Sequence, residues 1–141
     1  RYVYTRKNER GTHVIFVTST GRLSLERLWP SDGRDVDGVE PIAGARPRDS
    51  VRFISARLAS APRGLTAYRT PRPAAETLRD YADQVRAGGY EVLDFAAIGG
   101  GERSLGLEAG ADLRVLRKDG QMLIATSVPD GTGSFLSVVQ L

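Results

Sequence analysis

Histidine and cysteine, which often carry nucleophilic or metal chemistry, are scarce in this sequence. His13 is the single histidine among 141 residues, and there is no cysteine. A Ser-His-Asp triad or a histidine-based metal site would therefore have to use His13. That residue lies inside a β-forming run, Thr-His-Val-Ile-Phe-Val-Thr, with no nucleophile motif beside it. We expect a half-exposed strand residue there, and the lack of cysteine excludes disulfides and thiolate catalysis.

Two stretches have the composition of ligand-binding loops without the required spacing. The three glycines at 99–101 are followed by Glu-Arg-Ser-Leu, whereas a phosphate loop ends in Gly-Lys-Ser/Thr. The acids Asp32, Asp35, Asp37 and Glu40 approach the rhythm of a calcium loop, but the terminal bidentate glutamate and the flanking helices are missing. We therefore predict no catalytic residues, no cofactor and no metal site, and thus not an enzyme.

Positive charge is scattered along the chain rather than gathered. The sequence has 20 Lys and Arg against 17 Asp and Glu, a net charge of +3. A nucleic-acid binder normally shows a basic stripe interleaved with aromatic residues. The arginines closest to such a stripe are Arg46, Arg48, Arg52, Arg57 and Arg63, and they stand among apolar residues. A solvated face is therefore favoured over a polyanion-binding face, and we expect no nucleic-acid partner.

The elements that would position any site are clearest in residues 63–95, which read as strand, helix, strand. Prolines at positions 71 and 73 end the first extended segment, and Pro73 suits the first position of a helix. Gly88-Gly89 then stops the helix. Between these signals, apolar residues recur at helical spacing, namely Ala74, Leu78, Tyr81, Ala82 and Val85. We expect one main amphipathic helix over residues 73–87, with this stripe buried on a sheet.

The other segments alternate like antiparallel strands. Residues 1–30 predict an N-terminal β-meander with strands at 2–6, 12–18 and 22–28. Residues 31–50, rich in Gly, Pro, Asp and Arg, predict a long surface loop. Residues 51–141 predict a ββαβββ core. Together they indicate a single α+β domain over 1–141, an antiparallel β-sheet with the helix packed on one face, and no apolar run is long enough for a transmembrane segment.

Three tyrosines lie where strand, helix and strand meet: Tyr68, Tyr81 and Tyr90. Core packing is the simpler interpretation, because buried aromatic side chains contribute strongly to cores. The alternative is a pocket between helix and sheet lined by these tyrosines, in which Arg69 or Arg72 would hold an anion. Burial of the tyrosines in packing would exclude that pocket.

Partner contacts are expected at two places. In the 31–50 loop, Asp32 and Arg34 are the polar residues we single out as candidate contacts. An exposed edge of the sheet, for example the last strand at 134–141, is the second candidate. Such an edge can pair with an extended segment of another protein.

Four short motifs follow one another between residue 66 and the end of the chain. They are Thr-Ala-Tyr-Arg-Thr-Pro, the helix Ala-Ala-Glu-Thr-Leu-Arg-Asp-Tyr-Ala-Asp-Gln-Val, then Ala-Gly-Gly-Tyr-Glu-Val-Leu and finally Phe-Leu-Ser-Val-Val-Gln-Leu. In this arrangement residues 51–141 resemble the DUF4892-type module of Gram-negative bacterial envelope proteins. In that family the module often precedes an OmpA-like peptidoglycan-binding domain. The resemblance implies an envelope setting and supplies no catalytic residues.

These observations lead to two functional hypotheses. The first is a non-enzymatic interaction or structural module of the bacterial cell envelope, which docks a protein partner through a sheet edge or the 31–50 loop. The second is a small-ligand or glycan-binding periplasmic domain with a Tyr/Arg-lined pocket. The sequence begins at Arg1 rather than Met, as expected of a mature or trimmed domain whose targeting segment or anchor lies upstream. The resemblance implies a periplasmic or outer-membrane-associated location and a cell-wall link through a further domain.

Overall fold

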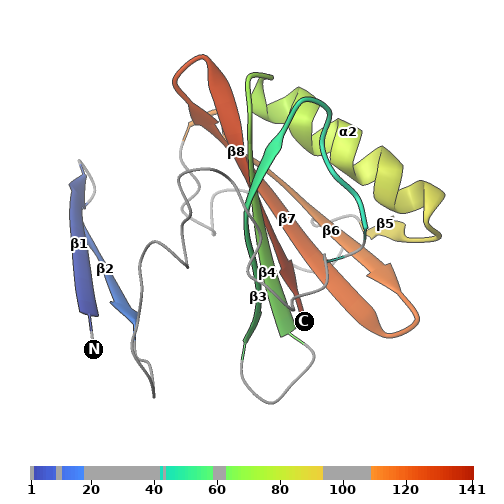
Figure 1. Ribbon diagram of the computed structural model, residues 1–141, viewed down its shortest axis with the longest axis horizontal. Helices are drawn as coiled ribbons and strands as arrows, with labels where there is room; N and C mark the ends of the chain where they lie inside the picture. Colours follow the sequence, from blue (N-terminus) through green and yellow to red (C-terminus); the bar gives the residue numbers. More distant parts are fainter. Residues whose placement is uncertain (1, 9–10, 18–41, 43, 59–62, 94–108) are drawn as a thin grey trace.

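Two sheets and one helix make up the described part of the protein (Figure 1). The computed structural model describes residues 2–8, 11–17, 42, 44–58, 63–93 and 109–141. The first sheet is an antiparallel hairpin of β1, Tyr2–Asn8, and β2, Gly11–Val17. Its strands occupy the first two strand positions of the predicted meander, and the third, 22–28, lies outside the described residues.

The second sheet has six strands, and every neighbouring pair is antiparallel. The strand order is β3-β4-β8-β7-β6-β5, so β3 and the short β5 are its edges. The last strand, expected at 134–141 as an exposed edge, is instead paired on both sides, with β4 and β7, so that prediction was wrong. The strands are β3 (Val51–Leu58), β4 (Arg63–Thr70), β5 (Glu91–Leu93), β6 (Asp112–Lys118), β7 (Gln121–Asp130) and β8 (Gly133–Gln140). Among the described residues four strands follow the helix, one more than in the ββαβββ order. The strand predicted directly after the helix is the three-residue β5, which pairs with β6 at the sheet edge.

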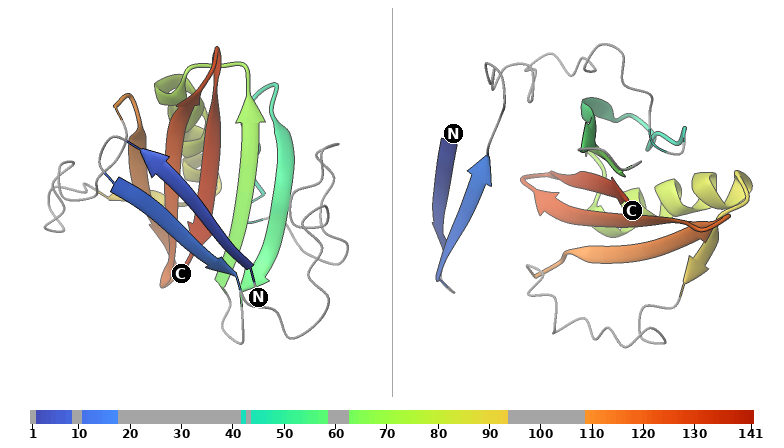
Figure 2. Two further views of the ribbon diagram at one scale, coloured as in Figure 1. Left: turned by 90° about the vertical axis from the view of Figure 1, so that its left-hand side faces the viewer. Right: turned by 90° about the horizontal axis from the view of Figure 1, so that it is seen from below.

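Helix α2, Ala74–Ala87, lies on one face of this sheet, against β5, β6, β7 and β8 (Figure 1, Figure 2). Its buried residues recur at helical spacing: Ala74, Thr77, Leu78, Tyr81, Ala82 and Val85. Pro73 is the N-cap residue and not the first helical residue, so that prediction was wrong by one position. Gly88 caps the other end. The predicted α+β fold, with a single helix packed on an antiparallel sheet, is confirmed.

The segment 44–50, which we call the strap, lies along α2 and β4. The backbone N–H of Arg46 donates to Gln84 Oε1 at 3.2 Å, and that of Arg48 donates to Asp80 Oδ2 at 2.8 Å. The Tyr68 hydroxyl donates to the carbonyl oxygen of Ala45 at 2.7 Å. These residues have no regular secondary structure, as expected for a loop, and they lie against α2 because helix side chains accept hydrogen bonds from the backbone N–H groups of Arg46 and Arg48. Residues 31–41 and 43 lie outside the described part.

The two faces of the six-stranded sheet differ in exposure. Toward α2, alternate residues of β7 and β8 are buried, for example Leu123, Ala125 and Leu136. On the opposite face, which we call the second face, Ile124 and Val139 are only half-buried. Within the described chain, no helix has the length and apolarity needed to cross a membrane.

Candidate functional site

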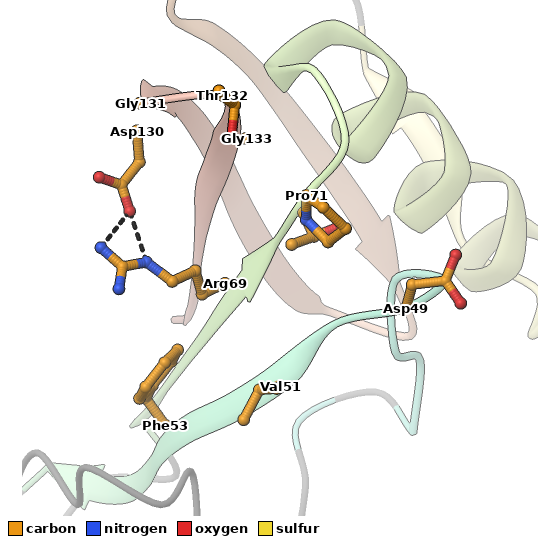
Figure 3. A pocket seen from close by; sticks show the side chains of 10 residues that line it. Asp49, Val51, Phe53, Arg69, Pro71, Asp130, Gly131, Thr132 and Gly133 are labelled. Carbon is orange, nitrogen blue, oxygen red and sulfur yellow. Dashed lines mark hydrogen bonds and ion pairs between the residues drawn. The ribbon is translucent and has the colours of Figure 1, made fainter.

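A pocket of about 500 Å³ lies between the ends of β3 and β4 and the β7–β8 turn (Figure 3). Its lining residues are Asp49, Val51, Phe53, Arg69, Thr70, Pro71, Asp130, Gly131, Thr132 and Gly133. Val51 and Arg69 are cross-strand partners and point to the second face, since the adjacent Tyr68 is buried under α2. The pocket therefore opens on the side of the sheet away from the helix.

Phe53 of the edge strand β3 lines this pocket at a β-bulge. Arg52 pairs with Tyr68 and Ile54 pairs with Ala67, so Phe53 is the extra residue between two consecutive partners on β4. A bulge bends its strand and can re-aim a side chain, which is why bulges are frequent beside functional sites. Figure 3 shows the Phe53 ring beside the stem of Arg69, on the same side as Val51.

The opposite wall is held by a close approach of two backbones. A Cβ atom added to Gly133 would lie 2.1 Å from the carbonyl oxygen of Thr70 and 3.0 Å from the Cα atom of Pro71. Ser134, the next residue, shares a buried 2.8 Å hydrogen bond with Thr77 of α2 through their hydroxyls. The β7–β8 turn is thus fixed both to the end of β4 and, through the sheet, to the helix.

The polar wall is an ion pair between Arg69 and Asp130. Arg69 Nε donates to Asp130 Oδ2 at 2.6 Å, and Arg69 Nη2 lies 2.5 Å from the same oxygen. The side chains are 61% and 35% exposed, so the pair adds little to folding stability. Its consequence for the site is electrostatic, since the two formal charges cancel at the pocket wall.

Asp49 completes the lining from the strap. It has a left-handed backbone conformation, with φ of +58°, and an exposed side chain. In Figure 3 its carboxylate is turned away from Arg69 and Pro71, toward α2. The backbone of Asp49 therefore borders the pocket, whereas its charge does not face the cavity.

The described tyrosines pack in the core, as the simpler interpretation predicted, and do not line a pocket between helix and sheet. Tyr68 and Tyr81 are 1% and 0% exposed, with ring centroids 6.5 Å apart, and both belong to the main core. Tyr90 is half-buried against the same core, and its hydroxyl donates to Gln121 Oε1 at 3.3 Å. These side chains fill the space between helix and sheet. The alternative in which they line a ligand pocket is therefore wrong, and core packing is the correct interpretation.

The predicted charged contacts are separated by the fold. Arg72 pairs with Glu76 at 3.3 Å and with Asp80 at 3.4 Å at the start of α2. Of the predicted site residues that the structure describes, Arg69 alone lines the pocket. Asp32 and Arg34 lie outside the described residues, as do the glycines at 99–101 and the other acids of the suggested calcium loop.

The pKa values of two buried tyrosines in the described chain are raised, and burial is the main cause in both. Burial raises the pKa of Tyr81 far above its ordinary value, and burial also raises the pKa of Tyr68, an effect that Arg52 partly opposes. Both groups are structural, because they lie in the core. Among described residues, no group of three His, Cys, Asp or Glu side chains is placed to hold a metal ion. The side chain of His13 is not among those described.

Comparisons with family models, with curated proteins and with solved structures find no match to this chain. The resemblance to the DUF4892-type module therefore stays a prediction.

Sequence reasoning missed most of the pocket. The run Pro129-Asp130-Gly131-Thr132-Gly133 is recognisable as a turn, since it combines proline, aspartate and glycine. The proximity of this turn to β3 depends on the order of the strands in the sheet, and no local sequence signal encodes that order. The bulge at Phe53 also has no signature, because it is defined by the register of β3 against β4.

Proposed function

We propose that this chain is a non-catalytic interaction module that docks a protein partner at the pocket and along the adjoining edge strand β3. The observation that carries this proposal is a preformed pocket that is bounded by the edge strand β3 and lined by Phe53 and Val51 beside Pro71. Aromatic side chains next to a preformed hollow are typical anchoring points for partners.

The form of the pocket supports docking with little reorganisation. Gly133 is in contact with the end of β4, and the Arg72 backbone N–H donates to Thr70 Oγ1 at 3.3 Å. The Thr70 hydroxyl in turn donates to the carbonyl oxygen of Arg48 at 3.3 Å. A rigid site loses less conformational entropy when a partner binds, so more of the contact energy appears as affinity.

The bulge also modifies the strand-addition hypothesis. Bulges interrupt the regular ladder and are one means by which edge strands avoid pairing with other chains. We therefore place the main contact in the pocket, with β3 as its border. The bacterial envelope setting is part of the proposal and has the sequence resemblance as its only support.

Site-specific photo-crosslinking in the native host tests the proposal. The photoreactive residue p-benzoyl-phenylalanine replaces exposed Thr132 at the pocket, and exposed Arg79 on α2 in the matched control. We expect a discrete adduct from position 132 that Phe53→Ala suppresses, and none from position 79. No adduct at position 132, equal adducts at both positions, or an adduct insensitive to Phe53→Ala would contradict docking at this pocket.

A small-ligand-binding domain is the second candidate, and the cavity size favours it. A volume of about 500 Å³ falls within the range of small-molecule sites. Native mass spectrometry of the purified chain distinguishes the two. A bound mass that disappears in Phe53→Ala would support the small ligand over the protein partner.

A further inference from the structure

The pocket presents an apolar surface with no net charge. Val51 and Phe53 supply one side, and Pro71 supplies another. The charged side chains of the lining are Arg69, Asp130 and Asp49, of which the first two pair with each other. Because the Asp49 carboxylate is turned away (Figure 3), the groups that face the cavity sum to zero charge.

The ion pair leaves hydrogen-bonding capacity on both partners. A guanidinium has five N–H donors, and the contacts to Asp130 involve only Nε and Nη2 of Arg69. On the carboxylate, both contacts go to Oδ2, which leaves Oδ1 as an acceptor. The remaining N–H donors of Arg69 thus lie beside the acceptor Oδ1 of Asp130. A peptide group has one C=O acceptor and one N–H donor, so it can form a hydrogen bond with each of them.

We propose that the pocket receives an uncharged apolar side chain of the protein partner, together with the peptide group that carries it. This inference rests on the proposed function and names the chemistry of the partner. The apolar side chain contacts Val51, Phe53 and Pro71, and the peptide unit meets the free positions of Arg69 and Asp130. The volume of about 500 Å³ is larger than one side chain, so adjoining main chain has room to enter.

Charged side chains fit this pocket poorly. A carboxylate approaching Arg69 meets Asp130 at the same point, and an ammonium group approaching Asp130 meets Arg69. Because Arg69 and Asp130 are partly exposed, an ionised group gains little from either of them unless an opposite charge is left uncompensated. In this site each available charge is already paired.

Titration of the ¹⁵N-labelled full chain with capped amino acids tests the inference. The probes are N-acetyl-leucinamide, N-acetyl-lysinamide and the amide of N-acetyl-glutamic acid, which are neutral, cationic and anionic. The amide signals of Gly131, Thr132 and Gly133 report binding. We expect the leucine probe to shift these signals in a saturable way, with an affinity about tenfold higher than that of either charged probe.

Two substitutions make the test specific to the ion pair. Asp130→Asn leaves Arg69 unpaired, so the glutamate probe should gain several-fold in affinity. Arg69→Gln leaves Asp130 unpaired, so the lysine probe should gain instead. The exposed pair of Arg86 and Asp83 on α2, 3.7 Å apart, provides the matched control. Arg86→Gln and Asp83→Asn should leave all three probe affinities unchanged.

The outcomes separate this inference from the proposed function. Preference of the unsubstituted chain for a charged probe would overturn the inference, while crosslinking at position 132 would still support docking. Failure of all three probes to shift the pocket signals would also overturn it. Loss of the crosslink at position 132 would remove the proposed function itself, whatever the probes show.

Discussion

Gly133 occupies a position where any side chain would collide with the backbone of β4. A Cβ atom there would lie 2.1 Å from the Thr70 carbonyl oxygen, a distance that requires the turn to shift. We expect Gly133→Ala to lower the free energy of unfolding by about 1–3 kcal/mol, as overpacking does in tightly packed interiors. Urea denaturation measures this loss.

Gly131 in the same turn is the matched control. It has φ of +61° and no atom within 4 Å of an added Cβ. Asparagine tolerates this backbone region, so Gly131→Asn should change stability by less than about 0.5 kcal/mol. Unchanged stability of Gly133→Ala would show that the turn is not fixed against β4 as described.

Tyr68 and Tyr81 are both buried but differ in hydrogen bonding. The Tyr68 hydroxyl donates to the Ala45 carbonyl oxygen, whereas the Tyr81 hydroxyl has no hydrogen-bond partner among the described residues. Tyr68→Phe should therefore cost about 1–3 kcal/mol, since the carbonyl of Ala45 loses its donor. Tyr81→Phe should be neutral or stabilising. Equal losses in the two variants, measured by denaturant unfolding, would contradict this difference.

The same two hydroxyls make stability depend on alkaline pH. Burial raises the pKa of both groups in the folded chain above the ordinary value of 10.0, so folded protein retains protons that the unfolded chain loses. Below pH 10 the two hydroxyls are protonated in both the folded and the unfolded chain, so the stability that they contribute is fully present. Above pH 10 the unfolded state binds fewer protons, so stability falls by up to about 1.4 kcal/mol per pH unit for each group.

Urea midpoints measured between pH 8 and pH 11 check this dependence. The variant in which both Tyr68 and Tyr81 are replaced by phenylalanine should lose this part of the slope. If the slope above pH 10 is the same in the variant, other groups are responsible for it.

The strap is an element with little regular structure, and α2 holds it in place. Asp80 and Gln84 stand one helical turn apart and accept hydrogen bonds from the backbone N–H groups of Arg48 and Arg46. We expect Asp80→Ala to raise the hydrogen-exchange rate of the Arg48 amide, because that N–H loses its acceptor. The exposed Asp83→Ala on the same helix is the control and should leave the rate unchanged. Equal rates in both variants would contradict the contact.

Elements with local signals could be predicted from the sequence, and elements fixed by distant contacts could not. Helix α2 was predictable because its prolines, apolar stripe and glycines all lie within about twenty residues of one another. The docking of the strap on α2 was not predictable, because its hydrogen bonds join residues that are 32 and 38 positions apart. Strand order and the bulge at Phe53 depend in the same way on pairing between separate segments.

The position of the candidate pocket was not predicted from the sequence, because it depends on which face of the sheet each strand residue points to. Arg69 was named as an anion contact in a pocket between helix and sheet, whereas it lines a pocket on the opposite face. Tyr68 and Tyr81, expected beside it in that alternative, are in the core. Tyr68 and Arg69 are adjacent on β4, and successive residues of a strand point to opposite faces. A pocket that uses Arg69 is therefore on the second face, away from the buried Tyr68.

At the scale of the whole molecule, the hairpin of β1 and β2 is separate from the six-stranded sheet. Among the residues that the structure describes, the members of the main hydrophobic core lie between Ile42 and Val138, and an isolated two-stranded hairpin contributes little stability in water. We expect a fragment of residues 42–141 to fold with a free energy of unfolding within about 1 kcal/mol of the full chain. Its melting temperature should then differ by less than roughly 8 °C.

A shorter fragment, residues 51–141, is the matched comparison because it also removes the strap. That fragment loses buried Ile42 and Ala45, and it loses the acceptor of the Tyr68 hydroxyl. Loss of buried apolar side chains and of a buried hydrogen bond should cost it several kcal/mol relative to residues 42–141, on the order of 3–5. Calorimetry of both fragments measures the difference. If the 42–141 fragment is unfolded, or no more stable than 51–141, the core must depend on the first forty-one residues rather than on the strap.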